Sequence, residues 1–294
     1  MFVERRLGQL SIPEEWSCGL AAGASGVFSA HPIDTLRVRQ MLHPEVRLGD
    51  HAANMLAKEG PQSLFKGICS PMICVGISKA ILFGALSKSV SWLDRGDGSC
   101  TPTPISHLFL GGVVAGAVVQ VIQNPVDRIK CTAQCDMKAT AVGVQQEMQI
   151  AKAICRVEGM AGLYRGLTIN LLSWPVSIGV WFSLNEWLLR RVDKYMGVQS
   201  SRSHFSLFWC GAASGTLAWA VSFPGDKAKV TLYEELSKTP TAWKSSNWDL
   251  LLPRIRAEGA SFFWRGMSGT ILRSPIQTGV TMWVYTKCRA MILD

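Results

Sequence analysis

One hexapeptide pattern occurs three times in this chain: a proline, an aspartate two residues later, and a lysine or arginine five residues later. The copies are Pro32 to Arg37, Pro125 to Lys130 and Pro224 to Lys229, so successive prolines lie 93 and 99 residues apart. Self-similarity at a fixed period is the signature of a fold built from repeated structural units. The chain is therefore predicted to be an internal triplicate.

Two further motifs keep the same period. Glycines precede each hexapeptide proline by nine and by thirteen residues, and such GxxxG pairs let two helix backbones approach closely in a membrane. Downstream, each copy carries Glu-Gly and then a triplet of aromatic residue, base and glycine. The triplets are Phe65-Lys66-Gly67, Tyr164-Arg165-Gly166 and Trp264-Arg265-Gly266. We expect three repeats, over residues 1–100, 101–200 and 201–294.

The composition favours a membrane protein. Only 17% of the 294 residues are charged, whereas soluble globular proteins usually have about a quarter. Trp, Phe and Tyr near the ends of long apolar stretches would suit the membrane interfaces. The stretches run roughly over 14–41, 67–93, 104–134, 167–190, 205–236 and 266–288. They predict an all-helical membrane protein with two spans in each repeat, and a soluble all-helical protein is the alternative.

Several other classes are not expected. The net charge of +9 suits anionic lipid, but the bases are spread through the repeats, so nucleic acid is not an expected partner. The cysteines form no CxxC pair, and Cys131 and Cys135 have no nearby histidine, so we expect no metal and no cofactor. We expect no enzyme, because no phosphate loop or nucleophile motif stands out. Residues 1–12 lack the apolar core of a secretory signal, which predicts internal targeting.

The hexapeptide predicts a kinked helix end with a ring of charges. A proline inside a membrane helix removes a backbone hydrogen bond and bends the helix, here at Pro32, Pro125 and Pro224. Around a pseudo-threefold axis, each aspartate can meet the base of another repeat. The expected pairs are Asp34 with Lys130, Asp127 with Lys229 and Asp226 with Arg37. Ionisable groups at membrane depth are costly, which favours a gate over ordinary charged helix ends at the interface.

Together the three motifs resemble the signature of the mitochondrial carrier family, over essentially the whole chain. The resemblance implies six tilted transmembrane helices in three pseudo-threefold repeats, a short matrix-side helix in each repeat, and alternating access in the mitochondrial inner membrane. It also implies cardiolipin at the helix starts marked by Gly67, Gly166 and Gly266, where N–H groups and the helix dipole favour an anion. We expect the carrier to act as a monomer.

The resemblance implies a second ring of charges at the cytoplasmic end. In this sequence only Glu186 and Arg289 keep the required charges, so we expect one cytoplasmic pair and a poorly held matrix-open state. The family glutamine that braces the matrix gate is present as Gln134. In the other repeats it is displaced to Gln40 or replaced by Tyr233.

Family substrate contacts lie seven or eight residues after the triplet glycine, which implies Cys74, Ser173, Trp174 and Arg273. A lone arginine at bilayer depth needs an anionic partner, and its planar fork suits a carboxylate or phosphate; a pair with a neighbouring helix is the alternative. Trp174 could hold a cation over its ring, stack on a flat ring, or pack against lipid. Lys79 lies about 140° round the helix from Cys74, which predicts a position off the substrate stripe.

Local sequence is most similar to the carnitine/acylcarnitine, ornithine and basic amino-acid branch and its less characterised members. Examples are His31 to Thr35 and Trp181-Phe182. That branch typically places an acid where this chain has Trp174, so the acid that would hold an amino group is missing. We expect exchange of a small carboxylate-bearing metabolite, amino-acid or carnitine-like. The alternatives are a nucleotide or cofactor carrier, and a carrier-fold membrane adaptor that does not transport.

Overall fold

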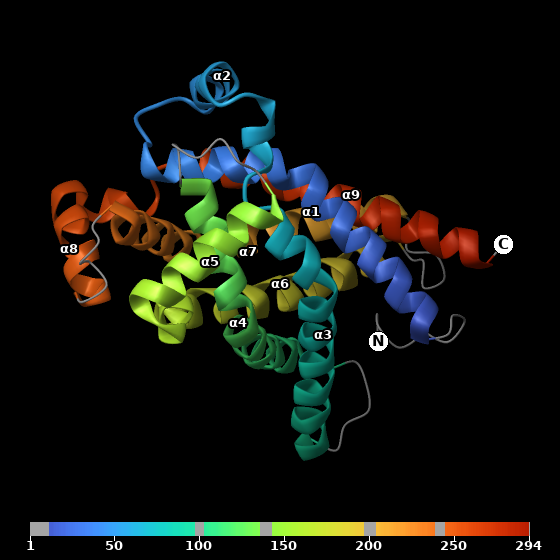
Figure 1. Ribbon diagram of the computed structural model, residues 1–294. Helices are drawn as coiled ribbons and strands as arrows, with labels where there is room; N and C mark the ends of the chain where they lie inside the picture. The colour runs from blue at the N-terminus through green and yellow to red at the C-terminus, as the bar shows by residue number, and fades with distance from the viewer. Residues whose placement is uncertain (1–11, 98–102, 136–142, 197–203, 239–244, 294) are drawn as a thin grey trace.

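The computed structural model describes residues 12–97, 103–135, 143–196, 204–238 and 245–293, and all regular structure in these ranges is helical. Each repeat contributes two long helices with a short helix between them, as Figure 1 shows. The long helices are α1 (Ile12–Leu42), α3 (Cys69–Asp97), α4 (Ile105–Cys135), α6 (Leu167–Met196), α7 (His204–Lys238) and α9 (Ser268–Leu293). The short helices are α2 (Leu48–Lys58), α5 (Val144–Glu158) and α8 (Asn247–Glu258).

The predicted all-helical architecture of three repeats is confirmed. The predicted apolar stretches begin within two residues of the observed long helices and end up to six residues early. Turns of 3-10 helix follow the short helices, at Pro61–Phe65, Met160–Tyr164 and Gly259–Phe263. The expected repeat boundaries near 100 and 200 fall on ranges 98–102 and 197–203, which lie outside the described residues.

The six long helices close into a ring, here called the helix ring. Packing contacts run in the order α1, α3, α4, α6, α7 and α9, and α9 returns to α1. Figure 1 shows α1 in blue beside α9 in red, although they come from opposite ends of the chain. Helices two places apart in this order, such as α3 and α6, can therefore touch only across the interior of the ring.

One end of the helix ring is closed by the first long helix of each repeat. Pro32, Pro125 and Pro224 lie inside α1, α4 and α7, as predicted. A proline lacks the N–H that would continue the hydrogen-bond ladder, so each of these helices can bend at that point. The three helices also contact one another. We call this end, where the hexapeptides lie, the hexapeptide end.

Small residues let neighbouring long helices approach closely. A Cβ atom added to Gly112 on α4 would lie 2.8 Å from the Cα of Gly179 on α6, and one added to Gly116 would lie 2.8 Å from the Cα of Pro175. These distances leave no room for a side chain, which is the packing that GxxxG pairs permit. The second repeat therefore depends on both glycines for its α4–α6 contact.

The outer surface suits lipid. Three segments of the described residues are long and apolar enough to cross a membrane: Pro61–Asp94, Ile105–Cys135 and Met160–Tyr195. Large apolar side chains on these helices point outward, for example Ile73 with 68% of its surface exposed and Leu172 with 73%. Exposed apolar surface of this extent is normal against hydrocarbon and costly against water.

Candidate functional site

Three ion pairs, each joining two repeats, hold the hexapeptide end together. They are Asp34 with Lys130, Asp127 with Lys229 and Asp226 with Arg37. We call this set the ion-pair ring. Its side chains are only 5% to 21% exposed, and the ammonium of Lys229 lies 3.3 Å from the Asp127 carboxylate. The structure thus brings together each pair that the triplicate pattern predicts.

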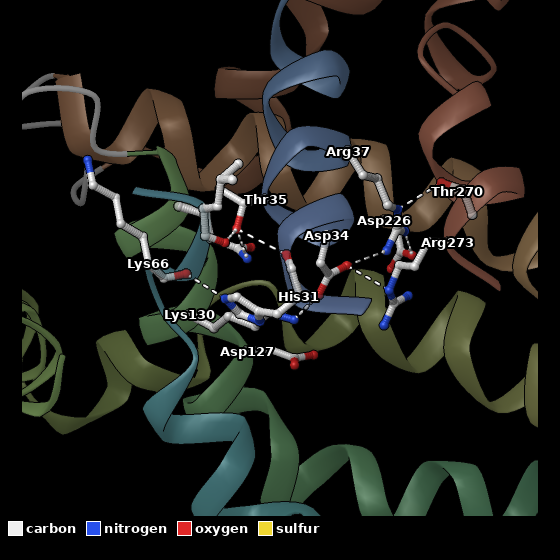
Figure 2. Close-up of polar contacts among 12 residues, drawn as sticks. His31, Asp34, Thr35, Arg37, Lys66, Asp127, Lys130, Asp226, Thr270 and Arg273 are labelled. Atoms are coloured by element: carbon white, nitrogen blue, oxygen red, sulfur yellow. Dashed lines mark hydrogen bonds and ion pairs between the residues drawn. The ribbon is translucent and has the colours of Figure 1, made fainter. Parts of the chain in front are cut away.

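Arg273 on α9 joins the ion-pair ring. Its Nε lies 2.9 Å from the carboxylate of Asp34 on α1, and Figure 2 shows Arg37, Asp226 and Arg273 gathered beside Asp34. The Arg273 side chain is 9% exposed, and its Nη1 is buried with no hydrogen-bond partner in the described part of the chain. Arg273 therefore pairs with an acid on a neighbouring helix and still keeps a buried donor for another group.

The charges of this cluster do not balance. Asp34 is contacted by three bases: Lys130, Arg37 at 3.6 Å, and Arg273. Across the cluster, four bases face three acids. The bases are Arg37, Lys130, Lys229 and Arg273, and the acids are Asp34, Asp127 and Asp226. One positive charge is therefore in excess at a buried position, where an uncompensated charge is costly and an anionic group would be stabilised.

Trp219 on α7 is the aromatic centre of the site, and the sequence analysis did not select it. The guanidinium carbons of Arg273 and Arg37 lie 4.5 Å and 5.1 Å from its ring centroid. The Trp174 ring meets it edge-on at 5.2 Å. Because α9 separates α7 from α1 in the helix ring, the contact with Arg37 crosses the interior. A signal existed: Trp219 precedes Asp226 by seven residues, which places both on one helix face.

The predicted substrate contacts do not all converge. Trp174 meets Arg273 through their shared neighbour Trp219. Ser173 instead packs against α7, and its hydroxyl donates to the Ile169 carbonyl of its own helix at 3.1 Å. A Cβ atom on Gly225 of α7 would lie 2.1 Å from that hydroxyl oxygen. Cys74 is partly buried on α3.

Gln134 lies next to the ion-pair ring rather than on it. Its Nε2 donates to the hydroxyl of Thr35 at 3.3 Å, and Thr35 in turn donates to the Leu64 carbonyl at 2.9 Å. In the first repeat, Gln40 accepts a hydrogen bond from the backbone N–H of Gly269 at 3.1 Å, at the start of α9. These contacts tie the hexapeptide helices to neighbouring repeats.

The glutamate of each Glu-Gly motif lies beside basic side chains, although the sequence analysis treated this motif only as a repeat marker. Glu59 accepts hydrogen bonds from Arg39 Nη2 at 2.9 Å and from Lys66 Nζ at 2.6 Å. Burial disfavours the charged carboxylate, but the hydrogen bonds from Arg39 and Lys66 outweigh it and hold the pKa of Glu59 below its usual value. Glu158 likewise lies 2.8 Å from Arg128.

The predicted cytoplasmic pair stays a prediction. Glu186 accepts a hydrogen bond from Arg190, one turn further along α6, at 2.9 Å. Arg289 belongs to α9, but its side chain lies outside the described residues. Glu186 would thus share its carboxylate between Arg190 and any partner on α9.

The triplet glycines are required by the backbone. Gly67, Gly166 and Gly266 have φ values of 75°, 86° and 85°, a region that other residues rarely adopt. A Cβ atom on Gly67 would also lie 2.8 Å from the Lys130 carbonyl oxygen. The glycines therefore allow a sharp turn that packs against the hexapeptide helix of another repeat.

The helix start after Gly67 already holds an anion from the protein. The two carboxylate oxygens of Glu147 on α5 accept hydrogen bonds from the backbone N–H groups of Cys69 at 2.8 Å and Ser70 at 2.6 Å. Such N–H groups, together with the helix dipole, are a ready anion site. In the second repeat, a surface hollow of about 350 Å³ lies just before α6 and is lined by Arg165, by Glu158 and by Ser246 at the start of α8.

Comparison with known proteins agrees with the motifs. A family model described as mitochondrial carrier protein matches residues 8–96, 101–195 and 200–294. The mitochondrial arginine transporter BAC2 of Arabidopsis thaliana is 28% identical over 92% of this chain and 88% of its own length. The mitochondrial basic amino acids transporter of Rattus norvegicus is 29% identical over 88% of this chain and 83% of its own.

The mitochondrial carnitine/acylcarnitine carrier protein of Mus musculus is 26% identical over 87% of each chain. These relatives are carriers by name, which places the chain among transporters rather than enzymes at the level of the family. The family and the branch are those that the sequence motifs resemble. The chain belongs to the mitochondrial carrier family and is a multi-pass protein of the mitochondrial inner membrane.

Proposed function

We propose that this carrier moves a small carboxylate-bearing solute, amino-acid or carnitine-like, by alternating access, and that Arg273 holds the solute carboxylate. The excess positive charge beside Asp34 carries the proposal. Arg273 is buried, its Nη1 has no partner among the described residues, and its planar fork suits a carboxylate. The names of the relatives, which specify arginine, basic amino acids and carnitine, agree with a solute that has a carboxylate.

The Arg273–Asp34 contact offers a way to couple binding to opening. A solute carboxylate that engages Arg273 competes with Asp34 for the same guanidinium. Asp34 then loses one of the three bases that stabilise its buried charge, which weakens the ion-pair ring. A ligand can open a gate only through better binding to the opening state, and this exchange supplies such a difference. In this proposal the ion-pair ring is the matrix gate, braced by Gln134 beside it.

Lipid contacts are proposed separately. We infer that cardiolipin binds in the hollow just before α6, because Arg165 and the N-terminus of α8 line it, together with Glu158. The glycine turn at Gly266 gives α9 a similar start. At Gly67, Glu147 holds the same N–H groups, so a lipid phosphate would have to displace a carboxylate. We propose that one chain, without a second copy, forms the transport unit, because the helix ring closes on itself.

Uptake into proteoliposomes tests the proposed function. Purified protein in phosphatidylcholine vesicles with cardiolipin would be offered labelled amino acids, carnitine and nucleotides. Arg273→Ala should abolish uptake of the transported carboxylate, since it removes the proposed anchor. Arg191→Ala is the matched control, because Arg191 also lies over a tryptophan ring, at 5.1 Å from Trp187, but is exposed. Full uptake by Arg273→Ala, or uptake of nucleotides alone, would contradict the proposal.

A further inference from the structure

Lys79 reaches into the interior of the helix ring. Its Nζ lies 5.6 Å from the ring centroid of Trp181 on α6, although α4 stands between α3 and α6. One turn further along α3, Phe83 makes a second contact of this kind, edge-on to Phe182 at 6.0 Å. Contacts between helices two places apart can form only across the interior. Lys79 was predicted to lie off the substrate stripe marked by Cys74, and its contact with Trp181 places it on the inward face of α3.

The lipid-facing side of α3 points the other way. Ile73 and Ile77 are 68% and 56% exposed and mark the outer surface. Lys79 follows Ile77 by two residues, which is about 200° round the helix. Yet Lys79 is itself exposed to solvent. An accessible side chain on the inward face indicates that the interior is open at this level.

The ammonium of Lys79 has no acidic partner within the described ranges, where it lies over the Trp181 ring. A lysine at membrane depth is costly unless it meets an opposite charge or water. A cation over an aromatic ring is stabilised only modestly, and tryptophan is the best such ring. Lys79 and Trp181 thus leave a positively charged, aromatic surface facing an open interior.

The repeat register fixes the level of Lys79 relative to Arg273. Cys74 and Arg273 each follow their triplet glycine by seven residues, so they occupy equivalent levels. Lys79 lies five residues beyond Cys74, which is about 7.5 Å further along a helix away from the hexapeptide end. Arg273 therefore lies at the closed end of the interior, and Lys79 lies further from the hexapeptide end.

We propose that Lys79 and Trp181 form a second anion subsite, and that the transported solute carries two anionic groups, one at Arg273 and one at Lys79. This inference rests on the proposed function and narrows its solute class to acidic amino acids, dicarboxylates and other solutes with two anionic groups. The same ammonium repels a cationic side chain. Solutes with a net positive charge should therefore be poor substrates, although two of the relatives are named for basic amino acids.

The experiment compares three labelled solutes in proteoliposomes: glutamate, carnitine and arginine. Wild-type protein should favour glutamate. Lys79→Gln should raise the KM for glutamate roughly tenfold, the loss expected for one charge-assisted contact, and leave carnitine uptake unchanged. Lys79→Arg should retain glutamate uptake, and Lys79→Glu should admit arginine. Lys88→Gln is the matched control, because Lys88 lies nine residues along the same helix, about 180° round from Lys79.

The outcomes separate the two proposals. Unchanged glutamate kinetics in Lys79→Gln, or a wild-type preference for arginine, overturns the Lys79 subsite and leaves Arg273 as the carboxylate anchor. Loss of all uptake in Arg273→Ala with normal uptake in Lys79→Gln also overturns the subsite alone. Thermal stabilisation of purified protein by glutamate provides a second readout, which Lys79→Gln should reduce and Lys79→Arg should keep. If wild-type protein shows neither uptake nor stabilisation with any solute, both proposals fail.

Discussion

The guanidinium of Arg273 on α9 and the carboxylate of Asp34 on α1 form a direct ion pair, with Nε 2.9 Å from Oδ1. One residue was selected as a solute contact and the other as a member of the ion-pair ring. Their contact makes the proposed solute site and the hexapeptide end one electrostatic unit. A substitution at either residue should therefore change the electrostatic environment of the other.

Asp34→Asn should destabilise the protein more than Asp127→Asn. Asp34 faces three bases, whereas Lys229 is the base that lies beside Asp127 within the described residues. Removing one partner of a buried ion pair costs about 3–5 kcal/mol, because it leaves a buried charge uncompensated. Thermal unfolding of the purified variants in detergent measures the difference. Equal melting temperatures would show that the network around Asp34 adds nothing beyond one pair.

Trp219→Leu should weaken solute binding. The substitution removes the ring that lies 4.5 Å from the Arg273 guanidinium carbon and 5.1 Å from that of Arg37. A desolvated cation–π contact contributes about 2 kcal/mol, so we expect a marked rise in KM for the transported solute. Trp219→Phe should restore part of the loss. Trp283→Leu on α9 is the control, because Trp283 is 65% exposed on the outside; an equal effect there would indicate a general loss of folding.

Gly67→Ala should be far more harmful than Gly60→Ala. Both glycines have positive φ, of 75° and 78°, so both substitutions strain the backbone, by about 1–3 kcal/mol each. A Cβ atom on Gly67 additionally meets the Lys130 carbonyl oxygen at 2.8 Å, whereas one on Gly60 has no atom within 4 Å. The yield of folded protein and its melting temperature should separate the two. Similar values for both would mean that strain alone makes these glycines necessary.

Glu147→Ala should make the first repeat dependent on lipid. The variant frees the backbone N–H groups of Cys69 and Ser70, which then form an empty anion site at the start of α3. We expect a lower melting temperature without cardiolipin and a larger increase than wild type when cardiolipin is added. Asp94→Ala serves as the control, since Asp94 lies near the other end of α3, with its carboxylate 2.7 Å from His107. A cardiolipin response equal to that of wild type would argue against the site.

The ring of ion pairs could be predicted because all three repeats carry it. Because equivalent helices surround one axis, Asp34 has few possible partners, and the repeat period predicts that its partner is Lys130. The helix starts were predictable for the same reason, since each follows a triplet glycine such as Gly166. Repetition turns a weak local pattern into a three-dimensional constraint.

Features found in one repeat only were harder to predict. Trp219, Lys79 and Glu147 have no equivalent residue in the other two repeats, and each lies on a different helix. A solute is not threefold symmetric, so the residues that could recognise it leave no period in the sequence. The direction of the Lys79 side chain depends on how α3, α4 and α6 pack against one another. A helical wheel of α3 alone does not include that packing.

The unequal surroundings of the three aspartates also imply an order of events. Asp34 is 5% exposed and shares three bases, whereas Asp127 is 21% exposed and lies 3.3 Å from Lys229. Water should therefore reach the seam between α4 and α7 first, and the α1 seams should part last. A chain assembled from three similar segments would then open in steps from one side, because its three aspartates differ in burial and in the number of bases beside them.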